Sequence, residues 1–210
     1  KKDKRTLSKF LFTRGIWLIF LEVVVNNFIW FFDPSYSLIV LQVIWAIGFS
    51  MLFLSCIIYF SNKIISVIGL VIICFHNLFD TFIYEGQSLY AILWYFLHQQ
   101  SMIKISEHTS LAFGYPIIPW VGLMALGYVM GSLYTEYQSK ERASLLMKFG
   151  IYSLLAFIVL RLTNFYGEPN HFAIQEKISF SVMALFNTTK YPPSLLYILM
   201  TIGPSLILLS

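Results

Sequence analysis

Long apolar runs alternate with short polar links along most of the chain. Because a helix of about 20 apolar residues crosses the hydrocarbon core of a bilayer, this pattern predicts about six transmembrane helices. We therefore predict an all-α fold, a polytopic integral membrane helix bundle that forms a single transmembrane domain over residues 1–210. The predicted spans are residues 10–32, 36–60, 64–82, 115–135, 145–162 and 192–210.

Two further segments are apolar in part but do not suit a membrane span. Residues 89–98 are too few to cross, and they carry Trp94 and Tyr95, whose rings are typical membrane-interface anchors. Residues 174–186 lie within a stretch that is too polar to span. We expect both segments to form interfacial helices on the outer side of the membrane.

Composition excludes a soluble domain. Hydrophobic residues are 58% of the chain, charged residues are 11%, and the mean hydropathy is +0.74, whereas about a quarter of a soluble domain is charged. The net charge of +4 does not indicate nucleic-acid binding, because the basic residues do not gather on one soluble face. Cys56 and Cys74 fall in different spans at different depths, so we predict neither a disulfide nor a metal site.

The distribution of lysine and arginine predicts the orientation. Cytoplasmic loops carry an excess of these residues. Most of the lysines and arginines here fall at the ends of the predicted spans that lie on the same side of the membrane as the N-terminus. These residues are Lys1, Lys2, Lys4, Arg5, Lys9, Lys63, Lys140, Arg142 and Lys148. We therefore place the N-terminus in the cytoplasm. The chain begins without methionine and ends inside an apolar run, so we expect it to be part of a longer chain.

Ionisable residues inside the predicted spans are the candidates for chemistry, because each needs a partner, a cavity or a proton in lipid. His76 and Asp80 are four residues apart, which places them on one face of an α-helix. At about 1.5 Å per residue, Glu22 and His76 each lie about 18 Å above the starts of their spans, and Arg161 comes out at a similar height, within about 6 Å. We infer a polar cavity in the outer half of the bilayer.

Structural roles are the alternative for each of these residues. Glu22 and Arg161 together are typical of a clamp inside a bundle, and His76 has the option of simply hydrogen-bonding across helices. Asp80 also fits an interfacial carboxylate at a helix end. Near the last span, Lys190 precedes Pro192 and a helix N-terminus that favours anions, and headgroup anchoring is the alternative there.

Several blocks of sequence resemble a known family. They are residues 10–22 (FLFTRGIWLIFLE), 76–80 (HNLFD), 115–131 from Tyr-Pro to Gly, 161–167 (RLTNFYG), and 187–195 with Gly203-Pro204. Together and in this order they look like bacterial membrane proteins related to the heparan-alpha-glucosaminide N-acetyltransferase catalytic domain. The resemblance covers essentially the whole chain.

This resemblance implies acetyl transfer across a membrane, from cytoplasmic acetyl-CoA to an amino sugar or other glycan on the far side. It also implies a location in the bacterial inner membrane. The family has earlier spans, with a histidine regarded as catalytic, that have no counterpart here, and that role is not transferred to His76. The expected partners are the lipid bilayer and the glycan acceptor, with no nucleic acid, and homo-oligomerisation stays open.

Acyl transfer requires a base for the acceptor's proton and donors for the developing oxyanion. We assign the base to His76, oriented by Asp80 or Glu22, and count these three as catalytic. The residues assigned to substrate binding are Arg161, Asn77, Lys190, Tyr191 and His98. The rival functions are a transporter or flippase that uses the same charges, and a purely structural membrane subunit.

Overall fold

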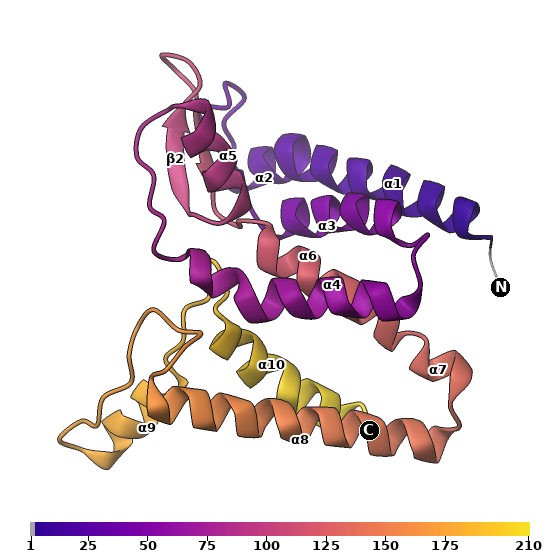
Figure 1. Ribbon diagram of the computed structural model, residues 1–210. Helices are drawn as coiled ribbons and strands as arrows, with labels where there is room; N and C mark the ends of the chain where they lie inside the picture. The colour runs from indigo at the N-terminus through magenta and orange to yellow at the C-terminus, as the bar shows by residue number, and fades with distance from the viewer. Residues whose placement is uncertain (1–2) are drawn as a thin grey trace. The chain divides into compact units, whose positions relative to one another are not determined.

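The computed structural model describes residues 3–210, so Lys1 and Lys2 of the predicted cytoplasmic group lie outside the described residues. The chain is mostly helical and divides into two compact units, of which the first extends to Val129 and the second is Met130–Ser210 (Figure 1). Each unit is built around helices that lie side by side.

The first unit opens with one continuous helical rod. It consists of α1 (Lys4–Phe20), the π-helical turn η1 (Leu21–Asn26) and α2 (Asn27–Phe31). Phe32 ends it in the left-handed region with a φ of 48°, directly before Asp33-Pro34, which is where the sequence predicts the stop.

Helix α3 (Val43–Ile57) lies against α1 (Figure 1), and the two backbones approach closely. A Cβ atom added to Gly15 would lie 2.6 Å from the Gly48 carbonyl oxygen, and one added to Gly48 would lie 2.8 Å from that of Gly15. Any larger residue at either position would separate the helices, so this contact depends on both glycines.

A small sheet, which the all-α prediction does not include, lies at one end of these helices. Its strands are β1 (Leu38–Leu41), β2 (Ser101–Lys104) and β3 (Ser110–Phe113), in the order β1-β3-β2. β3 pairs with β1 in parallel and with β2 in antiparallel.

The sheet therefore corrects the predicted span at 36–60, of which only Val43–Ile57 is helical. Leu-Ile-Val-Leu suits a buried strand as well as a helix, and only a distant partner strand decides between the two. Helix α5 (Leu89–Leu97) is helical as predicted, and it buries Ala91 and Tyr95 in a core with Leu41, Ile103 and Phe113.

The rest of the first unit contains α4 (Asn62–Phe75), the 3-10 turn η2 (His76–Phe79) and α6 (Ile118–Met130). A Cβ atom added to Gly122 would lie 2.8 Å from an Ile72 side-chain carbon, so α6 approaches α4 closely there. A Cβ added to Gly127 would meet nothing within 4 Å. The small residues at this helix contact are Gly122 and, on α4, Gly69, where an added Cβ would lie 3.0 Å from the Gly122 carbonyl oxygen.

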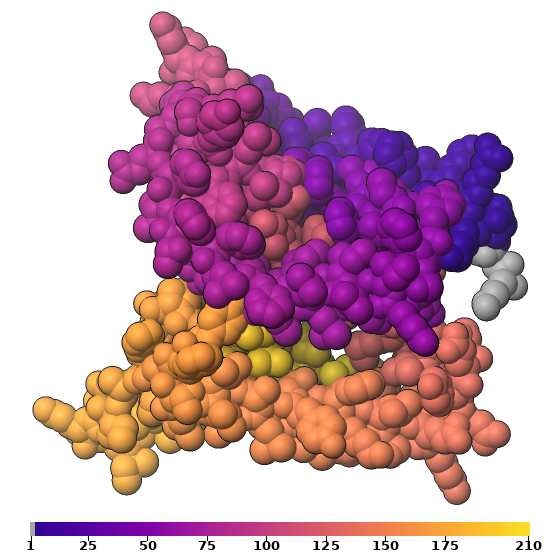
Figure 2. Space-filling model, viewed as in Figure 1, coloured from indigo at the N-terminus to yellow at the C-terminus, as the bar shows by residue number. Residues whose placement is uncertain are grey.

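The second unit is built on α8 (Ser139–Thr163) and α10 (Leu195–Leu208), which lie side by side in Figure 1. It also contains the short helices α7 (Leu133–Glu136) and α9 (Ile178–Phe186). No residue of α9 is buried. Helix α8 presents a long exposed surface in Figure 2, and its apolar residues Tyr152, Leu155 and Val159 are 56–64% exposed.

Within residues 3–210, three helical segments are long and apolar enough to cross a membrane: Asn62–Phe79, Ile118–Glu136 and Ser139–Thr163. They correspond to the third, fourth and fifth predicted spans. Val43–Ile57 and Leu195–Leu208 are apolar but shorter. Exposed apolar side chains on such helices fit a membrane protein, because lipid covers them as a protein core would. Six complete spans stay a prediction.

Candidate functional site

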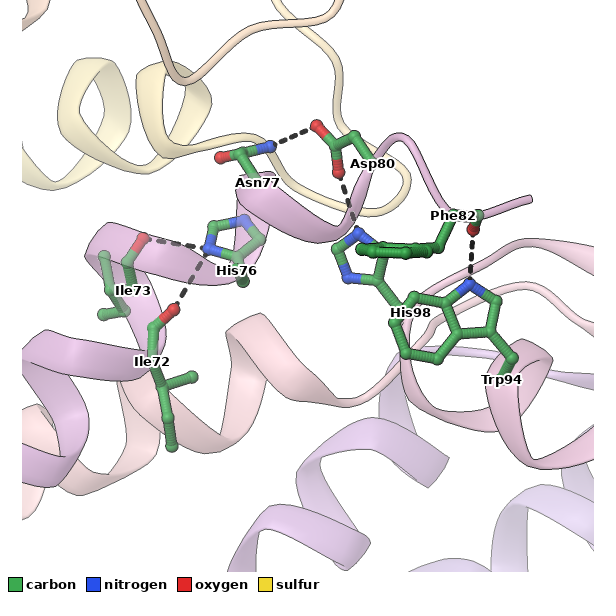
Figure 3. Close-up of polar contacts among 8 residues, drawn as sticks. All are labelled: Ile72, Ile73, His76, Asn77, Asp80, Phe82, Trp94 and His98. Carbon is green, nitrogen blue, oxygen red and sulfur yellow. Dashed lines mark hydrogen bonds and ion pairs between the residues drawn. The ribbon is translucent and has the colours of Figure 1, made fainter. Parts of the chain in front are cut away.

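The carboxylate of Asp80 connects two elements of the first unit. It follows η2 and accepts a hydrogen bond from Asn77 Nδ2 through Oδ2 at 2.8 Å (Figure 3). Its other oxygen, Oδ1, lies 2.8 Å from Nε2 of His98, the residue that ends α5. The pair joins the end of the third predicted span to the short helix that follows it.

Burial and bonding define the chemical state that this contact favours for His98. The side chain of His98 is 3% exposed and that of Asp80 is 26% exposed. Because a carboxylate only accepts, Nε2 of His98 carries the proton of this bond. The lone pair of the neutral ring is then on Nδ1, which is buried and has no hydrogen-bond partner among the described residues.

Aromatic rings surround the His98 imidazole (Figure 3). The ring centroids of Trp94 and His76 lie 5.3 and 6.1 Å from that of His98. The ring centroid of Phe79 lies 6.2 Å from that of His98. The indole of Trp94 is itself fixed, because its Nε1 donates to the Phe82 carbonyl oxygen at 2.8 Å. The imidazole is thus held by packing as well as by Asp80, as a pre-oriented base requires.

His76 is also buried, at 1% exposure, but its contacts differ from the predicted ones. Its Nδ1 lies 2.9 Å from the Ile73 carbonyl oxygen and 3.2 Å from that of Ile72, so Nδ1 carries the proton. Neither Asp80 nor Glu22 hydrogen-bonds to His76 in the described residues. The predicted pairing is therefore wrong, and the histidine that Asp80 orients is His98.

The change of helix type at His76 explains why Asp80 contacts Asn77 and His98 and not His76. An α-helix places residues i and i+4 on one face, whereas side chains at i and i+3 eclipse in a 3-10 helix. Asp80 therefore meets Asn77, three residues earlier, instead of His76, four residues earlier. A catalytic role of His76 itself stays a prediction.

Glu22 lies in the π-helical turn and is fully buried. Its Oε1 accepts from Asn26 Nδ2 at 3.2 Å and from the Gln42 backbone N–H at 3.3 Å. Oε2 has no hydrogen-bond partner among the described residues. Asn27 fastens the same turn to β1, because its side chain bonds both the N–H and the carbonyl of Val40. Glu22 is thus held in place by the sheet that the sequence does not predict.

Among the described residues, Arg161 donates to main-chain carbonyl groups of its own unit. Nε, Nη1 and Nη2 bond the carbonyl oxygens of Leu185, Asn170, Ala184 and Asn187 at 2.6–3.1 Å. These bonds fasten the C-terminal end of α9 to α8. The geometry is that of a structural clamp, and the predicted substrate contact of Arg161 stays a prediction.

Glu168, a carboxylate of the second unit that is 9% exposed, is not among the site residues predicted from the sequence. It accepts from Ser194 Oγ at 2.7 Å, from both the N–H and the hydroxyl of Thr189, and from the Asn170 N–H. Ser194 is the N-cap of α10. An acidic residue in a polar segment before a capping serine was the available signal, but its partners are too distant in sequence to be read from it.

Lys190 and Tyr191 lie next to each other on the surface ahead of α10, with Lys190 Nζ 5.0 Å from the centroid of the Tyr191 ring. A hydrogen bond with the Tyr191 side chain raises the pKa of Lys190 above its usual value. The ammonium group therefore stays charged at neutral pH, as the predicted anion contact requires.

Comparison with known proteins identifies the family. The family model described as heparan-alpha-glucosaminide N-acetyltransferase, catalytic, matches residues 1–166. The chain belongs to this family. No curated protein and no solved structure matches the chain.

The N-acetyltransferase match includes the Asp80–His98 pair, His76, Glu22 and Arg161, and it ends before Glu168 and Lys190. The family therefore supports a membrane acetyltransferase. In such an enzyme a buried imidazole that is oriented by a carboxylate can take a proton from an acyl acceptor.

Proposed function

We propose that this chain carries the acceptor-activating residues of a membrane-embedded acetyltransferase. The acetyl donor is acetyl-CoA from the cytoplasm, and the acceptor is an amino sugar or other glycan on the extracytoplasmic side. The observation that supports this proposal is the Asp80–His98 pair, whose Nδ1 is buried and without a partner, in a chain of the N-acetyltransferase family.

In this mechanism His98 is the general base. As the acceptor nitrogen or oxygen attacks the thioester carbonyl, its bond to the acetyl carbon forms, and the proton passes to His98 Nδ1. The carbon–sulfur bond then breaks, and the CoA thiolate leaves and recovers that proton. Asp80 touches only the far side of the ring, where its charge stabilises the imidazolium, so it is a positioning residue.

The oxyanion that forms on the acetyl group needs hydrogen-bond donors. Asn77, Lys190 and Tyr191 are the residues that we propose for contacts with the two substrates, together with Arg161. His76, whose ring lies 6.1 Å from that of His98, remains a proposed member of the same catalytic group. The bacterial inner membrane and a cytoplasmic N-terminus belong to the same proposal.

The test is direct transfer by the full-length protein in lipid vesicles. Labelled acetyl-CoA is supplied on one side and glucosamine or a glucosamine-terminated oligosaccharide on the other. We expect label to appear on the amine of the acceptor. Transport of the unmodified sugar without an acetylated product would instead support the transporter. If the folded protein gives neither an acetylated product nor transport, the enzyme proposal is refuted for these acceptors.

A further inference from the structure

Glu22 Oε2, His98 Nδ1 and Trp120 Nε1 are the buried side-chain polar atoms of the first unit that lack a hydrogen-bond partner among the described residues. The proposed function uses His98. The other two are complementary, because a carboxylate oxygen accepts and an indole N–H donates. Buried polar groups in native proteins are nearly always satisfied, so two such atoms need an explanation.

Both atoms are held at the same end of the sheet. Gln42, which follows β1, donates its N–H to Glu22 Oε1. The preceding residue, Leu41, accepts from the N–H groups of both Gly114 and Tyr115 at 3.1 Å. The ring of Tyr115 lies 5.7 Å from that of Trp120 in the first turn of α6. Glu22 and Trp120 are therefore joined through the ends of β1 and β3.

The segment that carries His98 is hydrogen-bonded to the connection from β3 to α6. The Ile117 N–H donates to the Phe96 carbonyl oxygen at 3.1 Å, and Gln100 Nε2 donates to the Gly114 carbonyl oxygen at 2.7 Å. His98 lies between Phe96 and Gln100 in the chain. The His98 segment is thus hydrogen-bonded to the connection from β3 to α6, and Glu22 is linked to the same connection through Gln42 and Leu41.

The chemistry of these atoms indicates the ligand. Glu22 is fully buried and forms no ion pair with a lysine or arginine in the described part of the chain. A metal ion needs several ligands, and the described residues contain no group of three or more His, Cys, Asp or Glu side chains that could hold one. A molecule with both an O–H or N–H donor and an oxygen acceptor satisfies both atoms, as water does and as a sugar, the acceptor of the proposed function, also does.

We propose that Glu22 and Trp120 form a subsite for the glycan acceptor beside His98. A hydroxyl or amino group of the sugar donates to Glu22 Oε2, and a sugar oxygen accepts from Trp120 Nε1. This inference rests on the proposed function and adds to it the residues that recognise the acceptor. Glu22 is thereby a binding residue, in place of its predicted role in orienting His76.

Conservative variants separate binding from structure. Glu22→Gln keeps the oxygen that accepts from Asn26 and Gln42 and replaces the unpartnered acceptor with an N–H donor group. Trp120→Phe keeps a ring against Tyr115 but removes the N–H. Trp17→Phe is the matched control, because Trp17 is 51% exposed on α1.

The experiment is calorimetric binding of a glucosamine-terminated oligosaccharide to full-length protein in nanodiscs without acetyl-CoA. We expect Glu22→Gln and Trp120→Phe each to weaken binding roughly 10- to 100-fold, as loss of a buried hydrogen bond does. The Trp17→Phe control is expected to bind as the wild type does. Wild-type affinity in both Glu22→Gln and Trp120→Phe would overturn the subsite, since water or the protein itself would then satisfy these atoms.

A second measurement covers a variant that folds poorly. Singly deoxygenated analogues of the sugar are titrated into the wild-type protein and into whichever variant folds. The subsite requires that one analogue binds the wild-type protein more weakly than the parent sugar does. The same analogue should bind the variant as tightly as the parent sugar does, because the variant already lacks that hydrogen bond. If every analogue binds more weakly than the parent sugar by the same factor in both proteins, the subsite is refuted. Acetyl transfer, assayed separately with these proteins, tests the proposed function independently of this result.

Discussion

The two oxygens of the Asp80 carboxylate have different partners, Asn77 within its own turn and His98 at the end of α5, each at 2.8 Å. The bond from Asn77 restrains the carboxylate independently of the histidine, which reduces the side-chain freedom that the contact with His98 has to remove. His98 is in turn confined by Trp94 and Phe79. At the scale of single residues, the site is therefore a pre-oriented imidazole.

Replacement of this imidazole tests its role. We expect His98→Gln to lower kcat of the full-length enzyme roughly 10²- to 10⁴-fold, the usual contribution of a general base. Asp80→Asn should lower kcat by a smaller factor and leave the KM for acetyl-CoA unchanged, because Asp80 positions the ring without touching the donor. Both are measured by transfer of labelled acetyl.

The control for this pair is His108→Gln, since His108 is exposed in the turn between β2 and β3. It is expected to keep the wild-type rate. Equal activity of the His98→Gln and His108→Gln proteins would exclude His98 as the base.

At the scale of elements, two short departures from α-helical geometry position the carboxylates. The π-helical turn η1 contains one extra residue, which rotates the side chains that follow by about 100° relative to an α-helix. Asn27, directly after it, reaches Val40 of β1. The tighter turn η2 aligns Asn77 with Asp80. Both turns lie where a helix meets the sheet or its adjoining segment.

The contact between α1 and α3 provides a prediction about helix packing. Gly48→Ala should destabilise the protein by about 1–3 kcal/mol, because the new Cβ would lie 2.8 Å from the Gly15 carbonyl oxygen. Gly127→Ala, where a Cβ meets nothing within 4 Å, should be neutral or stabilising by up to about 1 kcal/mol. Unfolding of the purified proteins in denaturant measures both, and equal stability of the two variants would contradict the close packing.

The turn between α2 and β1 predicts a dependence on pH. Asp33 accepts from the Ser35 hydroxyl and N–H and from the Ser37 N–H, and these bonds hold the pKa of its carboxyl well below the usual range. The pKa of Asp33 is lower in the folded state than its unfolded value of about 4. The stabilisation of the turn by the Asp33 carboxylate is therefore complete above about pH 4 and is lost as the pH falls toward the folded pKa.

Hydrogen exchange measures this effect. Protection factors of the Ser35 and Ser37 amides, which already correct for the intrinsic exchange rate, are expected to decrease as the pH falls below about 4. In Asp33→Asn they should be low and independent of pH. Protection that stays constant on acidification of the wild-type protein would show that the carboxylate does not support the turn.

At the scale of the whole molecule, three apolar helices among the described residues and membership in the N-acetyltransferase family fit a membrane acetyltransferase. The cations Lys63 and Lys140 lie at the beginning of α4 and of α8. The loop at Glu107 joins β2 to β3, which follow the C-terminal end of α4 in the sequence, the end opposite Lys63. The positive-inside rule then assigns these ends to opposite sides.

Cysteine labelling of intact cells tests this orientation. In a protein whose Cys56 and Cys74 are replaced by alanine, Glu107→Cys should react with a membrane-impermeant maleimide from outside. Lys63→Cys and Lys140→Cys should react only after the membrane is permeabilised. The opposite pattern would reverse the predicted orientation, with His98 then on the cytoplasmic side.

The sequence by itself determined the membrane class, the segments of α4, α6 and α8, and the family, because apolar runs and short sequence blocks are local properties. It also singled out Glu22, His76 and Asp80 as polar groups that need partners, and it assigned His98 to substrate binding. Which partners they have was decided by the tertiary structure. Asp80 and His98 are 18 positions apart and meet only because α5 folds back beside η2.

The small sheet has the same origin. Residues 38–41 are apolar in a way that suits a helix or a strand, and they became a strand because β3, far along the chain, supplies the hydrogen bonds. Glu22 gained its contact with Gln42 from that pairing. Hydrophobic periodicity reports which side of a segment avoids water, whereas hydrogen-bond partners depend on the path of the chain, and that path is a property of the folded molecule alone.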